Sequence, residues 1–166
     1  MTAEHWDDRY ATVGPTNVSW FQATPELSLA LITKVADHAA GIVDVGGGAS
    51  TLVDHLLENG FHDVTVVDLS QQALSAARDR IGESPVHWVV VDIRDWQPAR
   101  TFDVWHDRAA YHFLTDEDDR RRYWDLVRET VPLGGHVIVA TFAEDGPQTC
   151  SGLPVTRASA EETAAR

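Results

Sequence analysis

Ile42-Val43-Asp44-Val45-Gly46-Gly47-Gly48 is the stretch of sequence that decides the fold. It begins as an apolar run typical of a buried strand and ends in a turn of three glycines. A second apolar run, 64–67, is closed by an acid, Asp68. A strand, a glycine turn, a helix and an acid-tipped strand predict the first half of a nucleotide-binding crossover. Glycine suits the turn because a Cβ would block both the sharp bend and the approach of a ligand to the backbone.

The same alternation continues along the chain. Strands are predicted at about 41–46, 64–68, 86–91, 102–106 and 136–142, and helices at about 25–35, 50–59, 70–81 and 115–131. This order predicts an α/β fold with a doubly wound, mostly parallel, Rossmann-like sheet. Ser70 is a predicted helix N-cap, and Thr115 opens a predicted capping box. Residues 1–24 are predicted to form an N-terminal leader or lid, and residues 25–166 a single domain.

An acid stands near the carboxyl end of each of the first four apolar runs: Asp44, Asp68, Asp92 and Asp107. Ligands of open α/β sheets bind outside these ends. Carboxylates gathered there would repel a pyrophosphate but suit S-adenosylmethionine, which carries a sulfonium, an α-ammonium and a ribose diol. Thr51 stands where the dinucleotide fingerprint has its third glycine, which makes an NAD-dependent oxidoreductase the less favoured alternative. For any single aspartate, the other interpretation is an ordinary N-cap or turn residue.

The segment Asp44-Val45-Gly46-Gly47-Gly48-Ala49-Ser50 resembles the Asp/Glu-x-Gly-x-Gly-x-Gly motif of the class I S-adenosylmethionine-dependent methyltransferases, with Ser50 in place of the last glycine. The resemblance runs from about Trp6 to Pro154. It implies that Asp68 holds the ribose hydroxyls and that Asp92 accepts from the adenine amino group. The cofactor-binding residues it implies are Asp44, Gly46, Gly47, Gly48, Ser50, Thr51, Asp68, Leu69, Asp92, Ile93, Trp20 and Tyr10.

The segment His106-Asp107-Arg108-Ala109-Ala110-Tyr111-His112-Phe113 follows the fourth predicted strand. Asp107-Arg108-Ala109 resembles the Asp-Lys-Gly segment of protein-lysine methyltransferases, with Arg for Lys and Ala for Gly. The methyl acceptor is therefore expected to be a protein lysine or a small molecule. Asp107 is a candidate anchor for a cationic substrate or for the cofactor. His106 and His112 are candidate proton acceptors, and packed or solvated side chains are the alternative for both.

Other candidates lie outside this segment. Tyr10 and Trp20 of the aromatic leader are predicted to cover the cofactor, with core packing as the alternative interpretation. Cys150 is predicted to form part of a substrate wall. The eight histidines are scattered without metal-ligand spacing, so no metal is expected.

Composition narrows the classes of partner. The 166 residues carry 26 acids against 13 bases, a formal charge of −13 that disfavours nucleic acid as a partner. No apolar stretch approaches the ~20 residues that span a bilayer, and the first residues do not resemble a signal peptide. A single cysteine excludes an internal disulfide. These features predict a cytoplasmic protein without a membrane partner.

The end of the sequence carries one more expectation. Methyltransferases of this class continue with a helix and two further strands, which are not found after the predicted strand at 136–142. That strand is therefore expected to present an unpaired apolar edge. A homodimer paired through this edge and a truncated product are the two interpretations. The short end also motivates a second functional hypothesis, a non-catalytic cofactor-binding remnant or partner subunit.

Overall fold

A parallel five-stranded sheet forms the centre of the computed structural model, which describes residues 2–166. The strands are β1 (Ile42–Val45), β2 (Val64–Asp68), β3 (His87–Val90), β4 (Val104–Arg108) and β5 (His136–Ala140). Their spatial order is β3-β2-β1-β4-β5, and every neighbouring pair is parallel. The strand order reverses between β1 and β4, where such sheets open a crevice outside the carboxyl ends. The α/β, doubly wound, parallel fold predicted from the sequence is confirmed.

The helices are α1 (Ala3–Val13), α2 (Glu26–Val35), α3 (Leu52–Glu58), α4 (Gln71–Ile81), α5 (Glu117–Thr130) and α6 (Ala160–Ala164). Four of them, α2 to α5, cover the two faces of the sheet. Successive strand residues point to opposite faces. Ile42 and Val104 accordingly pack with Ile32 of α2 and with residues of α3 and α4. Val43 and Trp105 pack on the other face, with residues of α5.

The helix starts follow local hydrogen bonding. The Ser70 hydroxyl accepts from the backbone N–H of Ala73, as predicted for an N-cap. The prediction for α5 was wrong by one residue, because Asp116 and not Thr115 is the N-cap. The Asp116 carboxylate accepts from the backbone N–H groups of Asp118 and Asp119, and it complements the positive end of the helix dipole.

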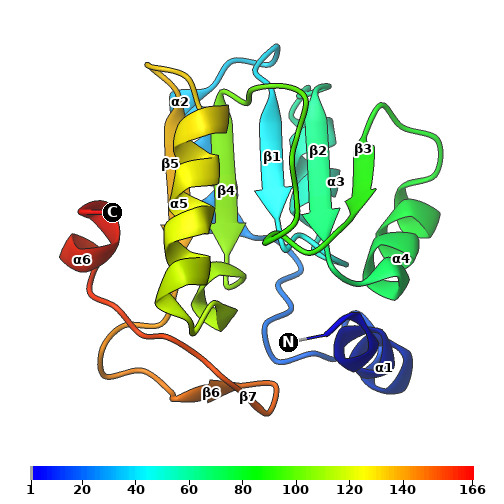
Figure 1. The fold of residues 1–166 in the computed structure, drawn as a ribbon. Coiled ribbons are helices and arrows are strands. Elements are labelled where there is room, and N and C mark those ends of the chain that lie inside the picture. The colour runs from blue at the N-terminus through cyan, green and yellow to red at the C-terminus, as the bar shows by residue number, and fades with distance from the viewer. Residues whose placement is uncertain (1) are drawn as a thin grey trace.

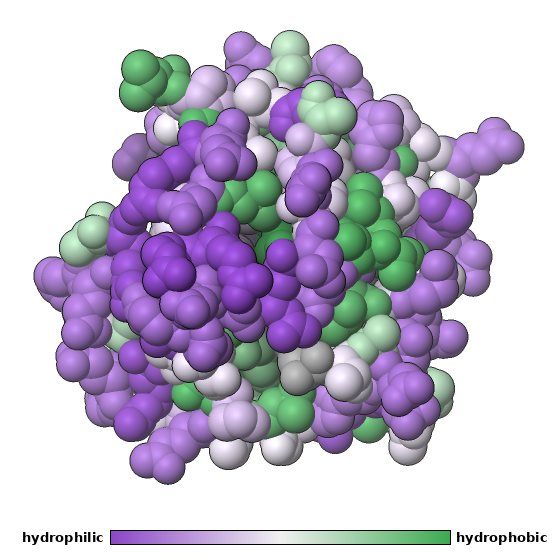
Figure 2. Space-filling view, viewed as in Figure 1, coloured by the Kyte–Doolittle hydropathy of each residue, from purple (hydrophilic) through white to green (hydrophobic). Residues whose placement is uncertain are grey.

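Two segments lie beyond the carboxyl ends of the strands (Figure 1). One is α1, from the predicted leader. The other is the small antiparallel hairpin of β6 (Thr149–Cys150) and β7 (Leu153–Pro154). Figure 2 shows hydrophilic side chains gathered over α5, as expected from the charged run that begins this helix, and a hydrophobic area to the right of it.

The edge formed by β5 is open on its outer side. Within residues 2–166, β5 pairs with β4 alone, and Val137 is 41% exposed. Leu27 of α2 is exposed as well, at 73%. The expected apolar edge is therefore present, and the homodimer through it stays a prediction.

Candidate active site

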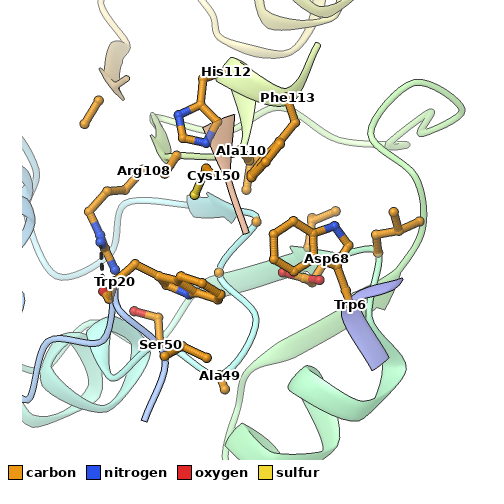
Figure 3. A pocket seen from close by; sticks show the side chains of 18 of the residues that line it. Trp6, Trp20, Ala49, Ser50, Asp68, Arg108, Ala110, His112, Phe113 and Cys150 are labelled. Atoms are coloured by element: carbon orange, nitrogen blue, oxygen red, sulfur yellow. Dashed lines mark hydrogen bonds between the residues drawn. The ribbon is translucent and has the colours of Figure 1, made fainter. Parts of the chain in front are cut away.

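A cavity of about 410 Å³ opens at the carboxyl ends of the strands. This volume lies within the range of about 300–1,000 Å³ that is typical of small-molecule sites. Asp68, Leu69 and Asp92 line one end, here called the Asp68 end. His112, Phe142 and Cys150 line the other, here called the His112 end. Figure 3 shows Asp68 beside Trp6 and, away from them, His112 near Cys150.

The glycine turn shapes the cavity floor. Gly46 and Gly48 have φ angles of +67° and +47°, which favour glycine over any residue with a side chain. A Cβ on Gly46 would lie 2.5 Å from Cβ of Ala110, and one on Gly47 would lie 2.5 Å from Oδ2 of Asp44. The sequence therefore needs small residues here to let the β1 turn, the segment after β4 and the Asp44 side chain pack together.

Beneath the turn, Asp44 belongs to a buried chain of polar groups. Asp44 lies opposite His106 in the β1–β4 register. Its Oδ1 lies 2.7 Å from Nδ1 of His106, and Nε2 of His106 lies 2.9 Å from Oγ of Ser28 in α2. Both Asp44 and His106 are at most 3% exposed. This chain links β1, β4 and α2 under the turn, and neither Asp44 nor His106 lines the cavity.

Asp68 presents a half-buried carboxylate to the cavity. Its Oδ1 accepts from the backbone N–H of Ser70 at 2.7 Å. A Cβ on Gly48 would lie 2.9 Å from its Oδ2. Burial, aided by the nearby negative charge of Asp44, raises the pKa of Asp68 to about 7. When it is ionised, the Asp68 carboxylate is a strong acceptor for hydroxyl donors. Hydrogen bonds from such donors would stabilise the ionised form and lower its raised pKa.

Asp92, at the same end, has a partner that the sequence analysis missed. Arg94 donates to Oδ1 from its backbone N–H and from Nε, and to Oδ2 from its terminal nitrogen. Burial acts to raise the pKa of Asp92, but the bonds from Arg94 outweigh it and lower that pKa below its usual range. Asp92 is therefore a fixed, ionised acceptor on the cavity wall.

Asp107 is hydrogen-bonded to buried groups of the protein and does not line the cavity. Its carboxylate is fully buried and accepts from the backbone N–H groups of Ala110 and Tyr111 and from the hydroxyl of Tyr123. The Tyr123 hydroxyl in turn accepts from Nε1 of Trp105. Burial raises the pKa of Asp107 to about 6 despite these bonds. Asp107 thus fixes the turn that leads into the short 3₁₀ helix Tyr111–Phe113.

His112 combines burial with unused hydrogen-bonding capacity. Its ring is fully buried between Phe113 and Phe142, at centroid distances of 4.4 and 4.8 Å. Neither ring nitrogen has a hydrogen-bond partner in residues 2–166. Burial lowers the pKa of His112 to about 4, so the imidazole is neutral at physiological pH. Buried polar atoms without partners are rare, and His112 lines the cavity.

The leader forms an aromatic wall over the Asp68 end. The Trp20 ring packs edge-on against Trp6 and Tyr10, at centroid distances of 5.8 and 6.3 Å. Asp7 fastens α1 to the start of α4, since its Oδ1 accepts from Oγ of Ser70 at 2.6 Å and from the backbone N–H of Gln72 at 3.0 Å. None of the residues of α1 is buried. The helix is therefore held by the Asp7 hydrogen bonds to α4 and by its aromatic contacts at the cavity, and not by a core of its own.

The structure separates the predicted site residues into two groups. Those that line the cavity are His112, Gly46, Gly47, Ser50, Asp68, Leu69, Asp92, Ile93, Trp20 and Tyr10, together with Cys150 of the predicted substrate wall. Those outside the lining are Asp44, Gly48, Thr51, His106 and Asp107. The expected set of four cavity-facing carboxylates is thus corrected to two, because the other two carboxylates turn inward to buried donors.

Thr51, one of the predicted site residues outside the lining, donates from its hydroxyl to the carbonyl of Gln22 and so holds the leader. Further lining residues were not among the predicted site residues. Three of these unpredicted lining residues are Arg108, Trp6 and Phe142. The sequence offered a signal only for Arg108 and Trp6, which stand in segments already singled out. Phe142 is brought there by the fold of the chain after β5.

Residues 42–135 match the family of proteins described as a methyltransferase domain. The match covers more than half of the chain. The chain belongs to this family, the class I S-adenosylmethionine-dependent methyltransferases, and the family membership predicted from the sequence is confirmed.

Individual relatives are more distant. The chain is 25% identical to the eEF1A lysine and N-terminal methyltransferase of Mus musculus over 122 residues, which are 71% of this chain and 17% of that protein. It is 24% identical to the malonyl-[acyl-carrier protein] O-methyltransferase of Anoxybacillus flavithermus over 92 residues, 54% of this chain and 35% of that protein. The chain therefore spans about a third or less of the length of these relatives.

Solved structures share the fold. A methyltransferase in complex with the Haloferax volcanii Trm112 methyltransferase activator has a TM-score of 0.78 and 18% identity over 99% of this chain and 73% of that one. DhpI, in a complex described as DhpI-SAM-HEP, has a TM-score of 0.75 and 17% identity over 98% and 83%. At these identities the likeness shows the fold alone. Within residues 2–166, no helix has both the length and the apolar character needed to cross a membrane.

Proposed function

We propose that this protein transfers a methyl group from S-adenosylmethionine to an acceptor bound at the His112 end of the cavity. The half-buried Asp68 carboxylate in the cavity lining is the observation that carries the proposal within the family fold. It stands at the end of the second strand, next to the glycine turn, and needs donors that a ribose diol would supply. The glycopeptide N-methyltransferase MtfA, a structural neighbour, has been solved in complex with S-adenosylmethionine, and the DhpI-SAM-HEP complex is a second such neighbour; both support the choice of cofactor.

The lining residues suit the parts of this cofactor. Asp68 would accept from the ribose hydroxyls, and Asp92 with Ile93 would border the adenine. Gly46 and Gly47 leave the backbone accessible where the amino-acid part would lie. Tyr10 and Trp20 would cover the nucleoside; burial and the charge of Asp68 raise the pKa of Tyr10 to about 12, so its phenol stays protonated. When bound, S-adenosylmethionine supplies an electrophilic methyl group.

The protein's part in such a reaction is mainly positioning. Methyl transfer is an in-line displacement, for which holding the reactants in one orientation supplies much of the rate. Asp107 fixes the segment that carries Ala110 and His112, so we assign it a positioning role. The chain of Asp44, His106 and Ser28 similarly supports the glycine turn from below. His112 is the remaining candidate for direct contact with an acceptor.

A small molecule is the first candidate acceptor, because the His112 end lies inside a cavity walled by aromatic side chains. The name of the malonyl-[acyl-carrier protein] O-methyltransferase supports an oxygen acceptor. A protein lysine is the second candidate, supported by the name of the mouse relative. A non-catalytic cofactor-binding protein is the alternative in a different functional class.

Calorimetry separates these functions. We expect S-adenosylhomocysteine to bind with micromolar affinity and NAD not to bind. Transfer from radiolabelled S-adenosylmethionine to panels of small acids, amines and lysine-containing proteins would then identify the acceptor. Binding of NAD alone would overturn the proposal. Tight binding of S-adenosylhomocysteine without transfer to any acceptor would favour the non-catalytic alternative.

Trp20→Ala tests the role of the leader. Trp20 is half-buried and belongs to the cavity wall, not to the two core clusters. We expect the substitution to weaken binding of S-adenosylhomocysteine about tenfold, the loss of roughly 1–1.5 kcal/mol from one aromatic contact. The free energy of unfolding of the ligand-free protein should change by less than about 1 kcal/mol. A large loss of stability in urea unfolding would show that Trp20 is a packing residue instead.

A further inference from the structure

Arg108 occupies an unusual place for a cation in this chain. Eight arginines in residues 2–166 lie within 4.0 Å of a carboxylate: Arg80, Arg94, Arg100, Arg120, Arg121, Arg122, Arg128 and Arg166. Arg9, Arg78, Arg108 and Arg157 form no such ion pair within the described chain, and of these four Arg108 is the one that lines the cavity. Its guanidinium makes one long hydrogen bond, from Nη1 to the carbonyl of Trp20 at 3.3 Å. Most of its five N–H donors are therefore available to a ligand.

The charges of the cavity are separated in space. Its lining contains two acids, Asp68 and Asp92, both at the Asp68 end. Figure 3 shows Arg108 on the opposite side of the Trp20 ring from Asp68. Asp107, the neighbouring acid in sequence, is occupied by three donors of its own and is fully buried. The side of the cavity away from Asp68 is therefore positive, in a protein of formal charge −13.

His112 adds an independent observation. Both of its ring nitrogens are buried without partners in the described chain, and the neutral ring can donate from one nitrogen and accept at the other. Because the pKa of His112 is about 4, it is a weak base. Taking a proton from a lysine ammonium, whose usual pKa is about 10.4, would be disfavoured roughly a millionfold. His112 therefore offers one hydrogen-bond donor and one acceptor to a ligand, and it is a poor base for a lysine ammonium.

We propose that Arg108 binds an anionic oxygen group, a carboxylate or a phosphate-type oxyanion, on the side of the cavity away from Asp68. The planar guanidinium matches two oxygens of such a group in a bidentate geometry. This inference rests on the proposed function, because it assumes that the Asp68 end holds the nucleoside. Two ligands carry the required chemistry: an acidic methyl acceptor, and the amino-acid carboxylate of the methyl donor.

An acidic acceptor would react without a base. One of its oxygens stays with Arg108 while the other forms a bond to the methyl carbon. The carbon–sulfur bond of the donor breaks, and its electron pair remains on sulfur as the neutral thioether. No proton has to leave, which agrees with the weak basicity of His112. The ester product has lost its negative charge, so its attraction to Arg108 falls and release is favoured.

Arg108→Gln, Arg108→Lys and the exposed control Arg78→Gln test the proposal by calorimetry. Each protein is titrated with S-adenosylhomocysteine and with 5′-methylthioadenosine, which lacks the amino-acid part. Each is then titrated, in the presence of saturating S-adenosylhomocysteine, with phenylacetate and its cationic counterpart 2-phenylethylamine. We expect Arg108→Gln to weaken one carboxylate ligand by about tenfold or more, the usual effect of losing a charge-assisted hydrogen bond. Arg108→Lys should keep part of the affinity, and Arg78→Gln all of it.

The pattern of losses identifies the source of the anion. If Arg108→Gln binds phenylacetate more weakly and S-adenosylhomocysteine as wild type does, Arg108 holds an acidic acceptor. If it binds S-adenosylhomocysteine more weakly and 5′-methylthioadenosine as wild type does, Arg108 holds the donor's carboxylate. If Arg108→Gln weakens binding of neither carboxylate, the proposal is overturned. A preference for 2-phenylethylamine over phenylacetate excludes the acidic acceptor and leaves only the donor's carboxylate as the ligand of Arg108. Failure of the wild-type protein to bind S-adenosylhomocysteine would instead refute the proposed function. If Arg108→Gln does not fold, the comparison of Arg108→Lys with wild type decides.

Discussion

Asp68→Asn is expected to weaken binding of S-adenosylhomocysteine about 100-fold while stabilising the ligand-free protein. The loss follows from replacing an ionised acceptor for two ribose hydroxyls, each such hydrogen bond contributing about 1.5 kcal/mol or more. The gain follows from removing a carboxylate whose pKa is raised to about 7 by burial. This rise in pKa corresponds to a free energy of about 4 kcal/mol. We expect the free energy of unfolding to increase by about half of that amount, because Asp68 lines an open cavity where solvent screens its charge.

The pH dependence of both effects has a defined sign. Between pH about 4 and 7, the folded protein binds more protons at Asp68 than the unfolded chain does. The contribution of this group to stability therefore falls as pH rises through that window. Affinity for S-adenosylhomocysteine changes in the opposite sense, because the ligand needs the carboxylate: it should rise up to tenfold per pH unit towards pH 7 and then level off. Asp68→Asn should abolish both dependences.

Asp79→Asn is the matched control for this experiment, because Asp79 is an exposed aspartate of α4 outside the cavity lining. It should leave the affinity and its pH profile unchanged. Calorimetry at pH 5.5, 6.5, 7.5 and 8.5 with thermal melts of the ligand-free proteins provides both readouts. An unchanged affinity in Asp68→Asn would remove Asp68 from the cofactor site.

Asp107→Ala is the second large effect, and it is expected to lower the free energy of unfolding by about 3–5 kcal/mol. The substitution leaves the backbone donors of Ala110 and Tyr111 and the hydroxyl of Tyr123 without their acceptor in a buried place. Each unsatisfied group costs about 1–3 kcal/mol. Methyl transfer should be lost as well, because the segment that places Arg108 and His112 would no longer be fixed.

Tyr123→Phe is the graded control for Asp107→Ala. It removes one donor to the carboxylate and leaves the two backbone donors in place, so a smaller loss of about 1–2 kcal/mol is expected. Urea unfolding of the three proteins measures the series. If Asp107→Ala is as stable as wild type and loses only acceptor binding, Asp107 contacts substrate directly and the positioning role is wrong.

The sequence by itself determined the order of elements and the place of the cofactor turn. Apolar runs located the strands because a parallel strand with helices on both faces is mostly apolar. The glycines at 46 and 48 marked the turn because their positive φ angles exclude most side chains. Asp68 and Asp92 line the cavity because each lies at the end of, or just beyond, an apolar strand, where the chain leaves the sheet.

Only the tertiary structure decided which way the other charged groups point. Asp44 and Asp107 lie within their strands, so the alternation of side chains between faces turned one towards His106 and the other towards Tyr123. Arg108 comes one residue later in β4 and lines the cavity instead. Phe142 reaches the same cavity through a segment far from the glycine turn in sequence. A linear pattern of acids carries no information on strand register or on buried donors, and these two factors set the final charge of the site.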